Sequence, residues 1–100
     1  MEVNINKEGL KTFVKIAGRI DTTNAEQFQK EISCLMEDET PDFEIDCSEL
    51  DYTSSQGLRL FLMLQKSVTA KSGKMVLKNM KPQIKEVFDI TGFSNIIKII

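Results

Sequence analysis

The amino-acid sequence predicts an α/β fold in two layers, with helices packed on one face of a mixed, mostly parallel sheet. Alternating segments and segments of helical periodicity follow one another in the order ββαβαβαβ, which is typical of strands joined by right-handed crossovers. The strands alternate in polarity instead of being apolar throughout, so only one face of the sheet should be buried. The buried face is expected to hold Val14, Ile16, Phe43, Ile45, Met75 and Leu77, and the open face Lys15, Glu44, Asp46, Lys74 and Lys78.

Turn and capping residues mark where these elements begin and end. Glu8-Gly9 separates the two strands of an antiparallel hairpin. Thr23 and Glu26 fit the capping box of a helix start, and Pro82 suits the first turn of a later helix. Ser72-Gly73 ends the helix in between, with the glycine expected in the left-handed conformation. The expected strands are Val3–Lys7, Leu10–Ala17, Asp42–Ser48, Lys74–Lys78 and Ile96–Ile100, and the expected helices run from Thr23 to Met36, from about Gln56 to Ala70 and from Pro82 to just before Gly92.

The sulfur-containing side chains are expected mainly in the core. Met36, Met63 and Met75 lie on core-facing patterns, where methionine serves as packing. Cys47 falls on the buried side of its strand, whereas Cys34 lies opposite the apolar stripe of its helix and should be exposed.

Length and composition limit the possible functions. One hundred residues, 11.4 kDa, predict a single domain spanning residues 1–100. A formal charge of -2 provides no positive field that would attract nucleic acid. The sequence has no histidine, which removes Ser–His and Cys–His nucleophile pairs, and two cysteines are too few for an all-cysteine zinc site. We therefore expect no metal, no cofactor and no catalytic residues.

Neither a signal peptide nor a membrane segment is expected. The N-terminus lacks a basic stretch followed by an apolar region, and the longest unbroken apolar run is Leu60–Leu64. A helix that crosses a bilayer needs about 20 predominantly apolar residues. These features predict a cytoplasmic protein without direct membrane insertion.

The stretch from Asp46 to Leu58 is the most informative part of the sequence. It leads from a strand through a polar loop into a helix, and four hydroxyl residues, Tyr52 to Ser55, crowd the helix start. Serine and threonine are common N-caps, and Gly57 can serve simply to allow close packing. A helix start also offers free N–H groups and a partial positive charge, which favour a phosphate. The same serines are therefore candidates for phosphorylation.

Four motifs, in order along most of the chain, resemble those of one known family. Gly18-Arg19-Ile20-Asp21 looks like its G-x-[IL]-D, and Asp46-Cys47-Ser48 looks like its D-x-S. Ser54-Ser55-Gln56-Gly57-Leu58 is similar to its [DS]-S-x-G-L at a helix start. Lys74–Leu77 and Val87–Phe93 look like its fourth strand and a helix ending in T-G-[LF]. The family is the STAS domain of bacterial anti-sigma factor antagonists.

The resemblance implies a partner-switching regulator and not an enzyme. In this family, the serine directly before x-G-L is phosphorylated by an anti-sigma factor that is also a serine kinase. That position is Ser55 here, with Ser54 as the alternative. The unphosphorylated antagonist binds the kinase and frees a sigma factor, phosphorylation releases the antagonist, and a phosphatase resets it. The residues implied to bind the partner near the phosphorylation site are Asp21, Thr22, Thr23, Ser54, Gln56 and Gly57.

The sequence departs from the family pattern at three points. Ser54 stands where many members carry Asp, Gln56 stands where another serine is common, and the chain ends at Ile100 where many members add a C-terminal helix. Two other hypotheses stay open. One is a STAS-like scaffold or small subunit of a signalling or membrane transport complex, which needs no phosphorylation. The other is a small enzyme that binds or hydrolyses nucleotides, although no G-x-x-x-x-G-K-[ST] loop is present.

Overall fold

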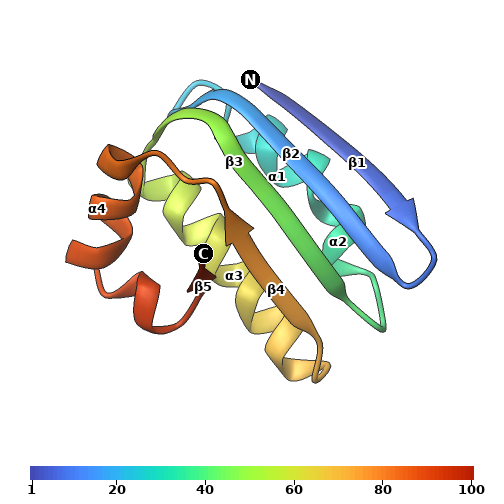
Figure 1. Ribbon diagram of the computed structural model, residues 1–100. Helices are drawn as coiled ribbons and strands as arrows, with labels where there is room; N and C mark the ends of the chain where they lie inside the picture. The colour runs from blue at the N-terminus through green and yellow to red at the C-terminus, as the bar shows by residue number, and fades with distance from the viewer.

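The computed structural model describes residues 1–100. It contains a five-stranded sheet with helices packed behind it (Figure 1). The strands lie in the order β1-β2-β3-β4-β5, with β1 antiparallel to β2 and every other neighbouring pair parallel. The predicted fold class and element order are thus confirmed. The strands are β1 (Glu2–Glu8), β2 (Lys11–Ile20), β3 (Asp42–Thr53), β4 (Lys74–Lys78) and β5 (Lys98–Ile99), and the helices are α1 (Ala25–Glu31), α2 (Ser33–Met36), α3 (Ser55–Ala70), α4 (Pro82–Ile90) and the short 3-10 helix η1 (Phe93–Asn95).

The two faces of the sheet differ as the alternation predicted. On the helix-covered face, the predicted apolar side chains are all buried. On the open face, Glu44 Oε1 lies 3.5 Å from Lys11 Nζ and 3.3 Å from Lys78 Nζ, so a carboxylate of β3 stands between lysines of β2 and β4. Exposed ion pairs of this kind contribute about 0–1 kcal/mol each. Their main effect is to keep this face of the sheet polar.

A chain of four phenylalanine rings joins the helices to one another. Phe28 of α1 lies 5.5 Å from Phe61 of α3, centroid to centroid, and Phe61 lies 5.7 Å from Phe88 of α4. The last contact, 6.4 Å, links Phe88 to Phe93 of η1. Tilted and edge-on rings at these separations attract one another in addition to burying area. Phe61 is one of the two inner members of this chain and is 1% exposed.

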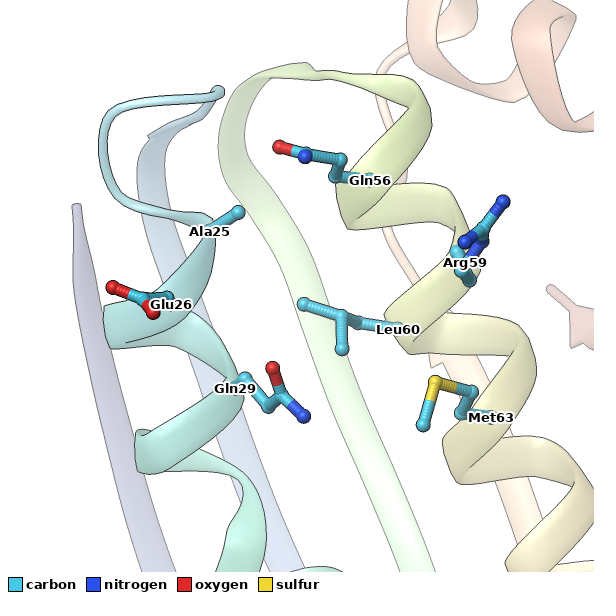
Figure 2. Close-up of a pocket in the computed structure, with 7 residues that line it drawn as sticks. All are labelled: Ala25, Glu26, Gln29, Gln56, Arg59, Leu60 and Met63. Atoms are coloured by element: carbon cyan, nitrogen blue, oxygen red, sulfur yellow. The ribbon is translucent and has the colours of Figure 1, made fainter.

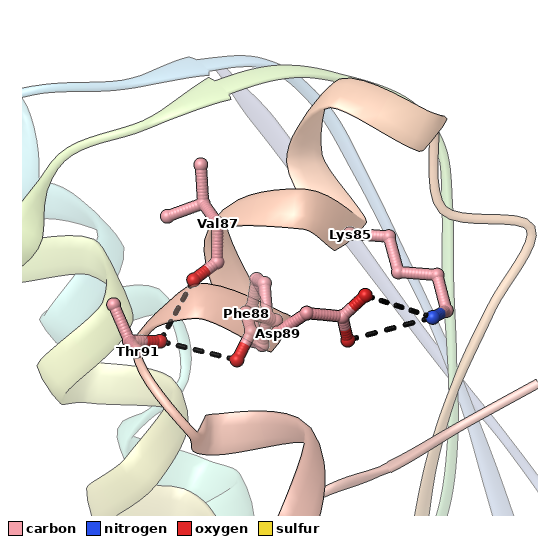
Figure 3. Close-up of polar contacts among 5 residues, drawn as sticks. All are labelled: Lys85, Val87, Phe88, Asp89 and Thr91. Atoms are coloured by element: carbon pink, nitrogen blue, oxygen red, sulfur yellow. Dashed lines mark hydrogen bonds and ion pairs between the residues drawn. The ribbon is translucent and has the colours of Figure 1, made fainter.

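Helix α4 ends before Gly92, as the sequence predicted, and Thr91 closes its last turn. The Thr91 hydroxyl donates hydrogen bonds to the carbonyl oxygens of Val87, at 2.8 Å, and Phe88, at 3.2 Å (Figure 3). Gly92 then adopts a φ of 80°, a left-handed conformation that glycine tolerates without strain. The chain turns into η1, so the last strand is only Lys98–Ile99, shorter than the predicted Ile96–Ile100.

The predicted capping box at Thr23 is wrong. The Thr23 hydroxyl donates to Asp21 Oδ1 at 2.6 Å, the helix begins at Ala25, and its N-cap residue, Asn24, makes no capping hydrogen bond through its side chain. A hydroxyl that finds a nearby carboxylate is withdrawn from helix capping. The predicted single helix to Met36 is also broken, because Ile32 separates α1 from α2.

The left-handed residue after α3 is Ser72, with a φ of 56°, and not Gly73 as predicted. Gly73 is required for another reason, since a Cβ at this position would overlap the carbonyl oxygen of Pro41. The prediction that Met63 is in the core is also wrong, because its side chain is 42% exposed on α3, whereas Met75 is buried. Both predicted cysteine environments are confirmed: Cys34 is exposed, and burial raises the pKa of the Cys47 thiol to about 12.

Removal of the Phe61 ring, which contacts rings of both α1 and α4, should destabilise the helical layer. We expect Phe61→Ala to lower the free energy of unfolding by about 3–5 kcal/mol, because the substitution leaves a cavity where three elements meet. Met63→Ala, on the same helix, is the control and should cost about 1 kcal/mol or less. Urea denaturation followed by circular dichroism measures both. Equal losses for the two variants would contradict this account of the core.

Candidate functional site

Strand β3 passes into helix α3 through one residue, Ser54. Its backbone is extended, with φ -78° and ψ 172°, and its N–H donates a hydrogen bond of 2.8 Å to the carbonyl oxygen of Ile20 at the end of β2. Its Oγ accepts a hydrogen bond of 3.2 Å from the Gly57 N–H, as an N-cap does. The residue is only 8% exposed. Ser54 is therefore buried and its hydroxyl is occupied by the fold.

Ser55, the next residue, is exposed to solvent as the first residue of α3. The first turn of α3 holds no acidic residue, so no negative side chain of the helix offsets the partial positive charge of its N-terminus. The fold thus separates two adjacent hydroxyls, one directed into the junction and one accessible to another protein.

Gly57 allows three segments to meet at this junction. A Cβ at this position would overlap the Thr53 hydroxyl and would lie 2.9 Å from Ile20 Cγ2. The ends of β2 and β3 therefore contact the first turn of α3 directly. The interpretation that this glycine serves close packing is confirmed.

Asp21 stands in the loop between β2 and α1. Its Oδ1 accepts hydrogen bonds from the Thr23 hydroxyl, at 2.6 Å, and from the Thr23 N–H, at 3.0 Å. These bonds hold the pKa of the Asp21 carboxyl below its usual value, and the bond from the Thr23 hydroxyl has the largest effect. The carboxyl group is therefore ionised at neutral pH. Asn24 fixes the loop from its other end, accepting from the Asp21 N–H at 2.9 Å and donating to the carbonyl oxygen of Arg19 at 2.8 Å.

The residues singled out in the sequence come from two segments that the structure joins. The hydrogen bond between Ser54 and Ile20 places the start of the Asp21 loop next to the start of α3. Ser55, Gln56, Thr22 and Thr23 are exposed, and Asp21 is half-buried. Ser54 and Gly57 are buried, so they contribute to this surface only by setting the position of the exposed residues around them.

A shallow groove of about 230 Å³ continues from this surface between α1 and α3 (Figure 2). Of the residues that line this groove, only Gln56 was predicted from the sequence to bind a partner. Residues on the flanks of two helices become neighbours only when the helices pack, so no local pattern could reveal the others. The groove is lined by Ala25, Glu26 and Gln29 from α1 and by Gln56, Arg59, Leu60 and Met63 from α3.

Two further contacts lie on the open face of the sheet, near the ends of β2 and β3. Neither contact was predicted from the sequence. The Arg19 guanidinium lies 4.4 Å from the centroid of the Tyr52 ring, and Lys81 forms an ion pair with Asp51. Strand β3 was predicted to end at Ser48, but it continues to Thr53 with register shifts against β2. This continuation brings Arg19 and Tyr52 side by side.

No group of three or more His, Cys, Asp or Glu side chains is arranged to hold a metal ion. None of the helices has both the length and the apolar character that spanning a bilayer requires.

Comparisons with known proteins agree with this fold. The family model described as the STAS domain matches residues 2–100. The protein BtrV of Bordetella bronchiseptica, assigned as an anti-sigma factor antagonist, is 36% identical over 81% of this chain and 70% of its own. The anti-sigma-B factor antagonist of Bacillus subtilis is 34% identical over 86% of this chain and 78% of its own. This chain therefore belongs to the STAS domain family, and its relatives are anti-sigma factor antagonists.

Solved structures show the same fold. The anti-sigma factor antagonist SpoIIAA in its unphosphorylated form superposes with a TM-score of 0.80, at 19% identity, over 99% of this chain and 88% of that chain. The phosphorylated form of SpoIIAA, from Bacillus, superposes with a TM-score of 0.75, at 19% identity, over 99% of this chain and 91% of that one.

The two serines should differ in their effect on stability. Ser54→Ala removes a helix cap and should lower the free energy of unfolding by about 1 kcal/mol. Ser55→Ala is the matched control, and we expect a change within about 0.5 kcal/mol, because its side chain is exposed. Denaturant unfolding of both variants against wild type measures the difference, and a larger loss for Ser55→Ala would contradict the assignment of the cap.

Proposed function

We propose that this chain is an anti-sigma factor antagonist that exchanges partners under the control of phosphorylation at Ser55. The observation that carries the proposal is the contrast between an exposed Ser55 and a buried, hydrogen-bonded Ser54 at the start of α3. A kinase must reach the hydroxyl that it modifies, and Ser55 is the accessible one. The sequence relationship to anti-sigma factor antagonists supports the same function.

The unphosphorylated chain binds an anti-sigma factor, which is also the serine kinase, through the surface around Ser55 and the Asp21 loop. Binding occupies the anti-sigma factor and frees a sigma factor. The kinase supplies the nucleotide, the magnesium and the catalytic base, so this chain acts as a substrate and not as an enzyme. We place this exchange in the cytoplasm, where transcription is regulated.

Phosphorylation of Ser55 adds about -1.5 to -2 charges at neutral pH. The new charge would have to lose water to enter the interface, which is costly, and it joins the ionised Asp21 carboxylate at the same surface. The phosphorylated chain therefore leaves the anti-sigma factor. A phosphatase then restores the hydroxyl.

Substitution at Ser55 tests the proposal. We expect Ser55→Ala to accept no phosphate from the anti-sigma factor kinase of the same organism, and to keep its affinity for that protein within a factor of about three, as for an exposed position. Ser55→Asp should bind at least about tenfold more weakly, because it places a charge at the interface. Ser54→Ala, the control, should still be phosphorylated. Phosphate-affinity electrophoresis and calorimetric titration measure the two effects.

Two results would contradict the proposal. Stoichiometric phosphorylation of Ser55→Ala would show that another residue is the phosphate acceptor. A wild-type chain that is captured with a signalling or membrane transport complex from its native cells, and that never carries phosphate, would favour the scaffold or transport-subunit hypothesis.

A further inference from the structure

Arg59 lies one helical turn beyond Ser55 on α3. Side chains four residues apart on a helix are neighbours, with about 5–6 Å between their Cβ atoms. Both residues are exposed, so they share the solvent side of the helix. Figure 2 shows the Arg59 side chain on the flank of α3, turned towards the first turn of that helix. Its guanidinium is thus directed towards the end of the helix at which Ser55 stands.

The Arg59 guanidinium has no ionic partner. It takes part in none of the five ion pairs of the structure. It is also the only charged residue between Ser55 and Gln65, so no other side chain of this stretch competes for a phosphate or repels it. Glu26, the one acidic residue that lines the groove, belongs to α1 on the opposite side.

We propose that Arg59 binds the phosphate group of phosphorylated Ser55 within the same chain. The inference rests on the proposed modification of Ser55 and adds a residue that regulates its effect. A planar guanidinium presents paired N–H donors that match the oxygens of a phosphate. The pair would offset part of the new charge and draw the guanidinium away from the groove. Phosphorylation would then change two features of the surface at once, the charge at Ser55 and the availability of Arg59.

The pKa of the second ionisation of the phosphate depends directly on whether Arg59 contacts the phosphate. Phosphoserine is introduced at position 55 of the full chain during translation, and the pKa of its phosphate is measured by ³¹P nuclear magnetic resonance. A nearby cation favours the dianion and lowers this pKa. We therefore expect Arg59→Gln to raise the pKa by about 0.3 of a unit or more, the scale of an exposed ion pair on a helix. Arg59→Lys should raise it less, because the charge remains while the paired donors are lost.

Lys66→Gln is the matched control, since it removes a charge from the same helix farther from Ser55. An unchanged pKa in Arg59→Gln, or an equal rise in Lys66→Gln, would overturn the proposal. High salt should reduce the difference between wild type and Arg59→Gln. Because the phosphate is placed during translation, the result does not depend on a kinase. A failure of Arg59 to bind the phosphate is thus distinguishable from an absence of phosphorylation in cells.

Discussion

The hydrogen bond from the Ser54 N–H to the Ile20 carbonyl oxygen is the constraint on which the site depends. It ties the end of β2 to the point where β3 becomes α3, so the backbone must change from extended to helical at one residue. With this residue fixed, its hydroxyl becomes the helix cap and the next hydroxyl must lie on the first helical turn. Gly57 makes the arrangement possible, because any side chain there would meet Thr53 and Ile20.

The rest of the fold holds this junction steady while leaving its outer surface free. Phe61 anchors α3 between Phe28 and Phe88, so the start of the helix is carried by a packed element. The Asp21 loop is held by hydrogen bonds within the chain. A rigid element that presents one hydroxyl suits a substrate of another enzyme, because recognition then requires little ordering of the chain. In the function proposed above, the start of α3 is this element and Ser55 is its hydroxyl.

The fold was predictable because the spacing of apolar residues, every second residue in strands and every three to four in helices, follows which side chains are buried. Burial of these side chains in turn stabilises the strands and helices. The choice between Ser54 and Ser55 was left open by the residues alone, since both are hydroxyls at one helix start and a shift of one residue exchanges their roles. The capping box failed because Asp21, two residues before Thr23, competes for the same hydroxyl. The groove between α1 and α3 was beyond prediction, because it exists only after the two helices pack.

The location of the phosphate on the chain from its native cells tests the central claim most directly. The protein would be isolated under growth and stress conditions, and the modified peptide fragmented by electron transfer, which retains the phosphate and separates neighbouring serines. The account predicts a condition-dependent phosphate on Ser55 and none on Ser54, whose hydroxyl is buried as the helix cap. Phosphate on Ser54, or its absence from both serines under every condition, would contradict it.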